Sequence, residues 1–227
     1  MIRNKKFPLT VFTLITLLIM ACQQEPVIHQ RPIQWDQERE QLSLEYLKQR
    51  HGMDMDKALI DPKMIVIHWT VIPTLEESFQ AFNPVRLPSA RSGIQSASAL
   101  NVSAHFLIDR DGTIYQLLPE TTFARHVIGL NHCAIGIENV ADGDQLPLTE
   151  EQYRANLQLV KYLSKKYDLE YLIGHDQYTR FVGHPLWKET DPDYLTHKTD
   201  VGEEFIHRLH EELKDTDLKK APENRKK

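Results

Sequence analysis

The feature that most constrains this chain is an alternation of short apolar runs with longer segments of helical periodicity. The apolar runs are rich in β-branched residues and cover residues 64–67, 104–108, 113–118, 134–140 and 171–174. Helical patterns cover residues 36–51, 149–167 and 202–213, and a short helix is expected from Thr74. Interleaved strands and helices are typical of α/β proteins. The Asp111-Gly112 turn between two of the runs predicts an antiparallel hairpin. We therefore predict a single α/β domain with a central mixed β-sheet flanked by helices.

Four segments follow one another along the chain. Residues 1–21 combine a basic start with an apolar stretch at 7–20, which has signal-peptide length and is short for a bilayer span. Residues 22–35 are polar, contain two prolines and are expected to be a linker. Residues 36–214 form the predicted folded domain. Residues 215–227 are highly charged, which is typical of a flexible tail.

The apolar stretch ends at Ala21-Cys22, which resembles the lipobox of bacterial lipoproteins. In this interpretation residues 1–21 are cleaved and Cys22 carries a lipid that tethers the domain to a membrane. Gln23 follows where an aspartate would direct retention in the inner membrane. We therefore expect the outer membrane, with the domain facing the periplasm. A plain signal peptide or an uncleaved anchor is the alternative.

The charge of the chain argues against one class of partner. Cleavage after Ala21 removes three basic residues and leaves 24 basic against 32 acidic residues, a net charge of −8. Nucleic-acid binding rewards dense positive charge, so no nucleic-acid partner is expected. Nothing in the sequence indicates an oligomeric state.

The second of the two cysteines, Cys133, has no partner for an internal disulfide if Cys22 carries lipid. Its place in the apolar run 133–137 is typical of a buried, inert thiol. A cysteine hydrolase that uses Cys133 as its nucleophile is the alternative, and it predicts inhibition by thiol alkylation rather than by chelators.

Two histidines stand directly after predicted buried strands, His68 after residues 64–67 and His175 after residues 171–174. Strand ends are rigid, which suits side chains that must hold a metal in fixed geometry. A catalytic zinc takes three protein ligands and keeps one position open. The pair therefore suggests a zinc site that needs one further ligand.

Several motifs resemble one known family when they are taken together and in order. They are 65–70 (IVIHWT), 103–108 (SAHFLI), 111–114 (DGTI), 135–138 (IGIE) and 174–175 (GH). This set resembles the type 2 N-acetylmuramoyl-L-alanine amidases, relatives of peptidoglycan recognition proteins and of amidase-type phage lysozymes. The resemblance spans roughly residues 60–205. It implies the fold of that family and a zinc-dependent cleavage of the amide between N-acetylmuramic acid and L-alanine in peptidoglycan or muropeptides.

The resemblance also implies a third zinc ligand, an aspartate or cysteine that follows the second histidine. Two aspartates compete for this position. Asp191 lies nearer to His175 in the sequence, whereas Asp200 keeps the family's lysine two residues before it and a glycine two residues after it. We favour Asp200, which makes residues 176–197 contain an insertion relative to shorter family members.

Two further residues match catalytic positions of the family. Glu138 ends an apolar strand, where a carboxylate is costly unless it faces a cleft, and it is the candidate that moves a proton between water and the leaving amine. Lys198 matches a cation that stabilises the oxyanion of the transition state. A solvent-facing Glu138 and a plain surface Lys198 are the alternatives.

Candidate substrate contacts lie on both sides of the Glu138 strand in the sequence. His126 and Asn131 precede the Glu138 strand, and Trp187 lies in the insertion, so these three are candidate substrate-binding residues. The family's Trp-His-Ala-Gly segment is Arg125-His126-Val127-Ile128 here, a departure that affects these contacts. Trp187 could equally pack the insertion onto the body. His105 is expected to be a core histidine or a support for the site.

A second function remains open at this level. Some relatives of the family bind peptidoglycan without cutting it, typically after losing a metal ligand. This sequence keeps all three candidate ligands, which favours the enzyme over a non-catalytic binding module of the same fold.

Overall fold

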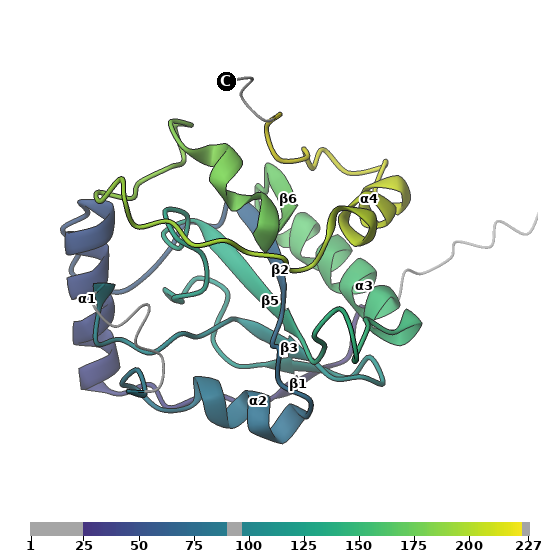
Figure 1. The fold of residues 1–227 in the computed structure, drawn as a ribbon, viewed down its shortest axis with the longest axis horizontal. Helices are drawn as coiled ribbons and strands as arrows, with labels where there is room; N and C mark the ends of the chain where they lie inside the picture. Colours follow the sequence, from purple (N-terminus) through teal and green to yellow (C-terminus); the bar gives the residue numbers. More distant parts are fainter. Residues whose placement is uncertain (1–24, 90–96, 224–227) are drawn as a thin grey trace, which may run out of the picture.

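The computed structural model describes residues 25–89 and 97–223 (Figure 1). The predicted signal peptide at residues 1–21 and the predicted lipid attachment at Cys22 lie outside the described residues.

One mixed β-sheet of six strands forms the centre of the described domain, in the order β1-β4-β3-β5-β2-β6. The strands are β1 (Ile28–Gln30), β2 (Met64–Trp69), β3 (Phe106–Ile108), β4 (Ile114–Gln116), β5 (Ala134–Asn139) and β6 (Tyr171–Gly174). Neighbouring strands are parallel except β3 and β4, which form the antiparallel hairpin expected around Asp111-Gly112. The predicted fold class, a single α/β domain with a mixed sheet, is confirmed.

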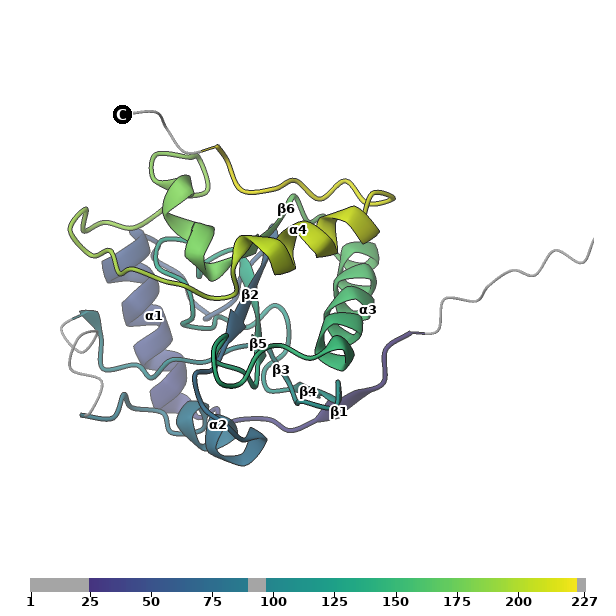
Figure 2. The same ribbon diagram turned by 45° about the vertical axis from the view of Figure 1, so that its right-hand side comes forward.

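Helices cover both sides of this sheet, as Figures 1 and 2 show together. The α-helices are α1 (Gln37–His51), α2 (Leu75–Phe82), α3 (Glu150–Lys166) and α4 (Glu203–Glu212), and the 3-10 helix η2 spans His175–Phe181. In Figure 2, α3 and α4 lie on one side of the strands and α1 lies on the other. None of the described helices combines the length and apolarity that a bilayer crossing requires.

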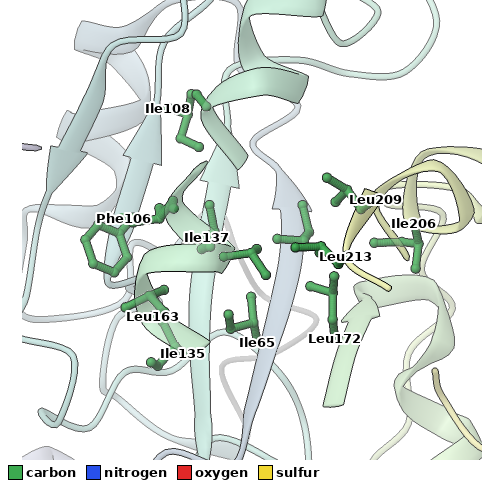
Figure 3. Close-up of a cluster of buried hydrophobic side chains, with 14 of the residues drawn as sticks. Ile65, Phe106, Ile108, Ile135, Ile137, Leu163, Leu172, Ile206, Leu209 and Leu213 are labelled. Carbon is green, nitrogen blue, oxygen red and sulfur yellow. The ribbon is translucent and has the colours of Figure 1, made fainter. Parts of the chain in front are cut away.

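The face of the sheet toward α3 and α4 carries the largest apolar cluster (Figure 3). Ile65, Ile135 and Ile137 point from the strands toward Leu163 of α3 and Leu209 of α4. Side chains alternate between the two faces of a strand, so the residues between these isoleucines point the other way. Met64 and Val66 accordingly join a second cluster on the opposite face, beneath η2. The metal-ligand candidate at the end of β2 is placed on that second face.

The helix ends agree with local sequence signals. Thr149 and Gln152 form the reciprocal capping box expected at the start of α3. Asp36 accepts a hydrogen bond from the Arg39 backbone N–H at the start of α1, and Gly52 ends that helix in the left-handed region at φ 64°.

Two stretches contain more regular structure than the sequence suggests. Within the expected linker, β1 pairs in parallel with β4. Within the expected flexible tail, Lys219 forms a parallel bridge to Tyr171, and its carbonyl accepts a hydrogen bond of 3.1 Å from the Leu172 backbone N–H. Both contacts are made through the backbone at the two outer edges of the sheet, and apolar periodicity does not report such pairing.

Candidate metal centre and active site

The candidate site lies where β2, β5 and β6 end. In the parallel pair β2·β5, His68 stands directly beside Glu138. His68 is two residues after Val66 on β2, and Glu138 is two residues after Gly136 on β5. Because side chains alternate along a strand, both point to the face opposite the main apolar cluster. His175 immediately follows β6, two residues after Ile173, which belongs to the cluster on that same face. Three rigid strands therefore bring these residues together at the carboxyl ends of β2, β5 and β6.

His68, His175 and Asp200 form the group of potential metal ligands within the described residues. The Asp200 Oδ2 atom lies 3.0 Å from His175 Nδ1 and 3.2 Å from His68 Nδ1. The two Nδ1 atoms are 2.9 Å apart. The residues are only 2%, 6% and 8% exposed. Three donor atoms that face one point, two from imidazoles and one from a carboxylate, are a ligand set that zinc accepts.

The protonation states of two of these groups also suit a metal. Burial, with the neighbouring His68, lowers the pKa of His175 to about 4, so its imidazole is neutral at pH 7. Burial opposes the ionisation of Asp200, but hydrogen bonding with His175 and the proximity of His68 outweigh it and hold the pKa of that carboxyl well below its usual range. A neutral imidazole and an ionised carboxylate are the forms that bind metal.

Asp191, the competing aspartate, lies in a different environment. Its Oδ2 is 3.6 Å from the Arg50 guanidinium, and its side chain is 48% exposed. The same guanidinium lies 2.8 Å from Glu189, so Asp191 belongs to a group of charges that ties the insertion to the end of α1. The group of His68, His175 and Asp200 does not include it.

A cavity of about 210 Å³ opens beside the three candidate ligands. Glu138 and Lys198 both line it, as do Arg125 and Val71. Glu138 is 8% exposed and Lys198 is half-buried. A buried carboxylate and an ammonium group therefore border the same space as the candidate metal ligands, which is the arrangement that proton transfer and oxyanion stabilisation need.

The three candidate substrate-binding residues occupy different positions. His126 and Asn131 line a smaller cavity of about 60 Å³ that also borders His175 and Lys198. Trp187 lines neither cavity. Its ring stacks on Tyr178 at a centroid distance of 6.1 Å and covers Gly129, where an added Cβ would lie 2.6 Å from the indole. In the structure, Trp187 packs the insertion onto the body.

Two other residues that the sequence singled out are buried. His105 accepts a hydrogen bond of 2.9 Å from the Gly136 N–H, and its other ring nitrogen contacts the Thr122 carbonyl. Burial raises the pKa of the Cys133 thiol to about 12. Cys133 precedes β5 at the end opposite Glu138 and lines neither cavity near the ligands, so the structure offers no support for a nucleophilic role.

A buried amide pair that supports the site was missed from the sequence. Asn139 donates a hydrogen bond of 3.0 Å from its side-chain amide to the His68 carbonyl, and Asn156 of α3 donates one of 2.7 Å to the Asn139 side chain. An asparagine next to Glu138 in an apolar run, and another on the apolar face of a helix, were the available signals. Their pairing depends on the packing of α3 against the sheet.

Comparisons with known proteins agree with this fold. Among solved structures, the N-acetylmuramoyl-L-alanine amidase LysC from Clostridium intestinale URNW shares 20% identity with a TM-score of 0.54, over 86% of this chain and 99% of that one. The endolysin N-acetylmuramoyl-L-alanine amidase LysCS from the same organism shares 20% identity with a TM-score of 0.52, over 87% of this chain and 99% of that one. At this identity the likeness concerns the fold. No curated protein matches the chain.

A family model described as N-acetylmuramoyl-L-alanine amidase matches residues 58–202. That range includes β2, β5, β6, both histidines and Asp200, and it is more than half of the chain. The chain therefore belongs to the N-acetylmuramoyl-L-alanine amidase family.

Proposed function

We propose that this protein is a zinc-dependent amidase that cleaves the bond between N-acetylmuramic acid and L-alanine in peptidoglycan or muropeptides. The observation that carries the proposal is the meeting of His68 Nδ1, His175 Nδ1 and Asp200 Oδ2 in a chain of this family. These three residues are the proposed zinc ligands. The complete ligand set favours an enzyme over a non-catalytic binding module.

The proposed roles of the other residues follow from their positions on the cavity. A bound zinc ion would polarise the scissile carbonyl and make a water molecule more acidic. Glu138, on the strand beside His68, accepts a proton from the attacking water and returns it to the leaving amine. Lys198 places its positive charge near the carbonyl oxygen as that oxygen becomes negative.

Purified protein loaded with zinc and incubated with muropeptides tests this function. We expect release of free stem peptide, detected by mass spectrometry. Glu138→Gln should keep the bound zinc and lose activity by roughly 100-fold or more, because a positioned acid–base group contributes about that much. If the zinc-loaded wild type bound muropeptides and released no stem peptide, the protein would be a binding module and the proposal would be lost.

We also propose that the protein is anchored in the bacterial envelope by a lipid on Cys22, in the outer membrane and facing the periplasm. The support is the sequence pattern at Ala21-Cys22 and the glutamine that follows it. Cys22→Ser should move the protein from the membrane fraction to the soluble periplasmic fraction, measured by fractionation and immunoblotting. Wild-type protein that carries no lipid by mass spectrometry would contradict the anchor.

A further inference from the structure

The imidazole of His126 lies between one proposed zinc ligand and the backbone of strand β5. Its Nδ1 atom is 3.0 Å from His68 Nε2, and its Nε2 atom is 3.1 Å from the Ala134 carbonyl oxygen. The far nitrogen of His68, Nδ1, is the atom that faces His175 and Asp200. Three polar groups therefore stand in a row from the start of β5 to the candidate metal centre.

The direction of each hydrogen bond in this row follows from its fixed end. A backbone carbonyl can only accept, so His126 must carry its proton on Nε2 and donate to Ala134. In a neutral imidazole the other nitrogen is then an acceptor. His126 Nδ1 therefore accepts a hydrogen bond from His68, which must carry its own proton on Nε2. The lone pair of His68 is left on Nδ1, the atom at the metal centre.

We propose that His126 is a positioning residue that fixes the tautomer and ring orientation of His68, so that the Nδ1 lone pair of His68 faces the metal before a metal binds. The proposal rests on the function proposed above, because it assumes that His68 is a zinc ligand. It gives His126 a role different from the substrate contact that the sequence suggested.

Several contacts hold the His126 ring in this place. Asn131 Oδ1 accepts hydrogen bonds of 2.8 and 2.7 Å from the backbone N–H groups of His126 and Val127. The ring lies directly over Gly136, where an added Cβ would be 2.8 Å from its Cγ and Nδ1 atoms. The glycine of the 135–138 motif thus provides the room that the imidazole occupies.

The other histidine ligand lacks such a partner. His175 Nε2 is buried and has no hydrogen-bond partner among the described residues. Its Nδ1 atom contacts Asp200, which is itself a proposed ligand. Of the two histidines, His68 is therefore the one whose orientation is set by residues outside the ligand set. The first ligand is thereby fixed relative to β5, the strand that also carries Glu138.

The main test compares zinc dissociation constants of variants, measured by competition with a chelating dye. His126→Leu removes both hydrogen bonds, and loss of such a partner typically weakens metal binding about 10- to 100-fold. His126→Gln can still accept through its carbonyl and donate through its amide, so it should recover most of the affinity. His210→Leu is the matched control, because it also removes a buried imidazole that contacts a backbone carbonyl, that of Leu172, without touching a ligand. It should bind zinc like the wild type.

Gly136→Ala tests the position of the His126 ring by a change in strand β5. The added methyl group must displace His126, so zinc affinity should fall in the same direction although every imidazole is still present. If His126→Leu and Gly136→Ala both folded and bound zinc as tightly as the wild type, the proposal would be overturned.

A second measurement needs no variant. Nitrogen-15 NMR of the metal-free wild type at neutral pH should report His68 protonated on Nε2, and the opposite tautomer would also overturn the proposal. These outcomes are separate from activity. Tight zinc binding with the expected tautomer but no release of stem peptide would refute the proposed amidase and leave the positioning role standing. Stem-peptide release by the wild type together with unchanged zinc affinity in the variants would refute the positioning role and leave the proposed amidase standing.

Discussion

Asp200 and Asp191 have similar sequence surroundings and opposite structural ones. Asp200 is buried between two histidines, and Asp191 is half-exposed beside Arg50. We predict that Asp200→Ala weakens zinc binding by more than about 100-fold, because loss of a direct ligand exceeds the loss of an outer partner. Asp191→Ala should retain zinc. Elemental analysis after dialysis measures both, and zinc loss confined to Asp191→Ala would reverse the assignment.

Buried neutral histidines predict how stability responds to pH. Burial, with His132 nearby, lowers the pKa of His51 to about 3. An unfolded histidine has a pKa near 6.5, so between about pH 6.5 and 3 the unfolded chain binds more protons than the folded one. The buried His51 therefore costs no stability above about pH 6.5, and its cost to the free energy of unfolding grows as the pH falls below that value. At pH 5 this histidine alone should cost about 2 kcal/mol relative to pH 8.

His51→Phe tests this cost, because the ring packs among Tyr46, Phe123 and His132 and an aromatic substitute keeps that packing. Urea unfolding at pH 5 and pH 8 should show a smaller difference between the two pH values than in the wild type. His207→Gln, at an exposed histidine of α4, is the control and should leave the difference unchanged. If the stability difference between pH 5 and pH 8 were as large in His51→Phe as in the wild type, the predicted cost of protonating His51 would be contradicted.

The site residues differ in how far the sequence could identify them. His68, Glu138 and His175 were predictable because each ends or follows an apolar run, and strand ends of a parallel sheet meet at one edge. The roles of Asn139, Asn156 and His126 were not predictable. They depend on hydrogen bonds between segments far apart in the chain, and the periodicity of apolar residues does not indicate such contacts.

At the scale of elements, the segment of residues 176–197, which contains the predicted insertion, is fixed to the end of α1. The Glu189 side chain is fully buried and lies 2.8 Å from the Arg50 guanidinium, which also stacks over Tyr194 at 4.2 Å. Thr190 donates backbone and side-chain hydrogen bonds to the carbonyls of Arg50 and Gln49. The insertion is therefore held by one buried ion pair and two hydrogen bonds to a helix terminus.

We predict that Glu189→Leu lowers the free energy of unfolding by about 3 kcal/mol, because it removes the buried partner of Arg50 and leaves that charge only the half-exposed Asp191 at 3.6 Å. The double variant Arg50→Met with Glu189→Leu should recover much of this loss, since both charges are then gone. Urea unfolding of the two single variants and the double variant measures the coupling. Additive losses would show that the pair does not hold the insertion.

The sequence predicted most helices and strands, but it did not predict the two segments that pair at the outer edges of the sheet. The six-residue core strands and the capped helix α3 carry strong apolar periodicity, and the structure contains them. By contrast, β1 and the segment around Lys219 are polar. A strand at the edge of a sheet pairs through its backbone, so its side chains need show no alternation.

At the scale of the whole molecule, the C-terminal segment is expected to contribute to stability. Lys219 exchanges backbone hydrogen bonds with Leu172 and Glu170, of 3.1 and 2.8 Å, and Leu218 packs against the main apolar cluster. Removal of residues 215–227 should therefore cost roughly 2 kcal/mol and lower the Tm by about 5 °C. Thermal unfolding followed by circular dichroism measures it.

A shorter truncation is the control for this prediction. Removal of residues 224–227 alone leaves Lys219 and Leu218 in place and should not change the Tm. If both truncations melted like the full chain, the backbone bridge at β6 would contribute nothing to stability.

The pairing of Lys219 with β6 also has a consequence for how copies of the protein meet. An uncovered strand edge offers backbone N–H and C=O groups that strands of other molecules can extend into shared sheets and aggregates. Here the segment around Lys219 occupies part of the outer edge of β6, and the opposite edge is the three-residue strand β1. At high local concentration, copies of the protein would thus meet through side chains, because the edges of the described sheet leave little open backbone to drive edge-to-edge self-association.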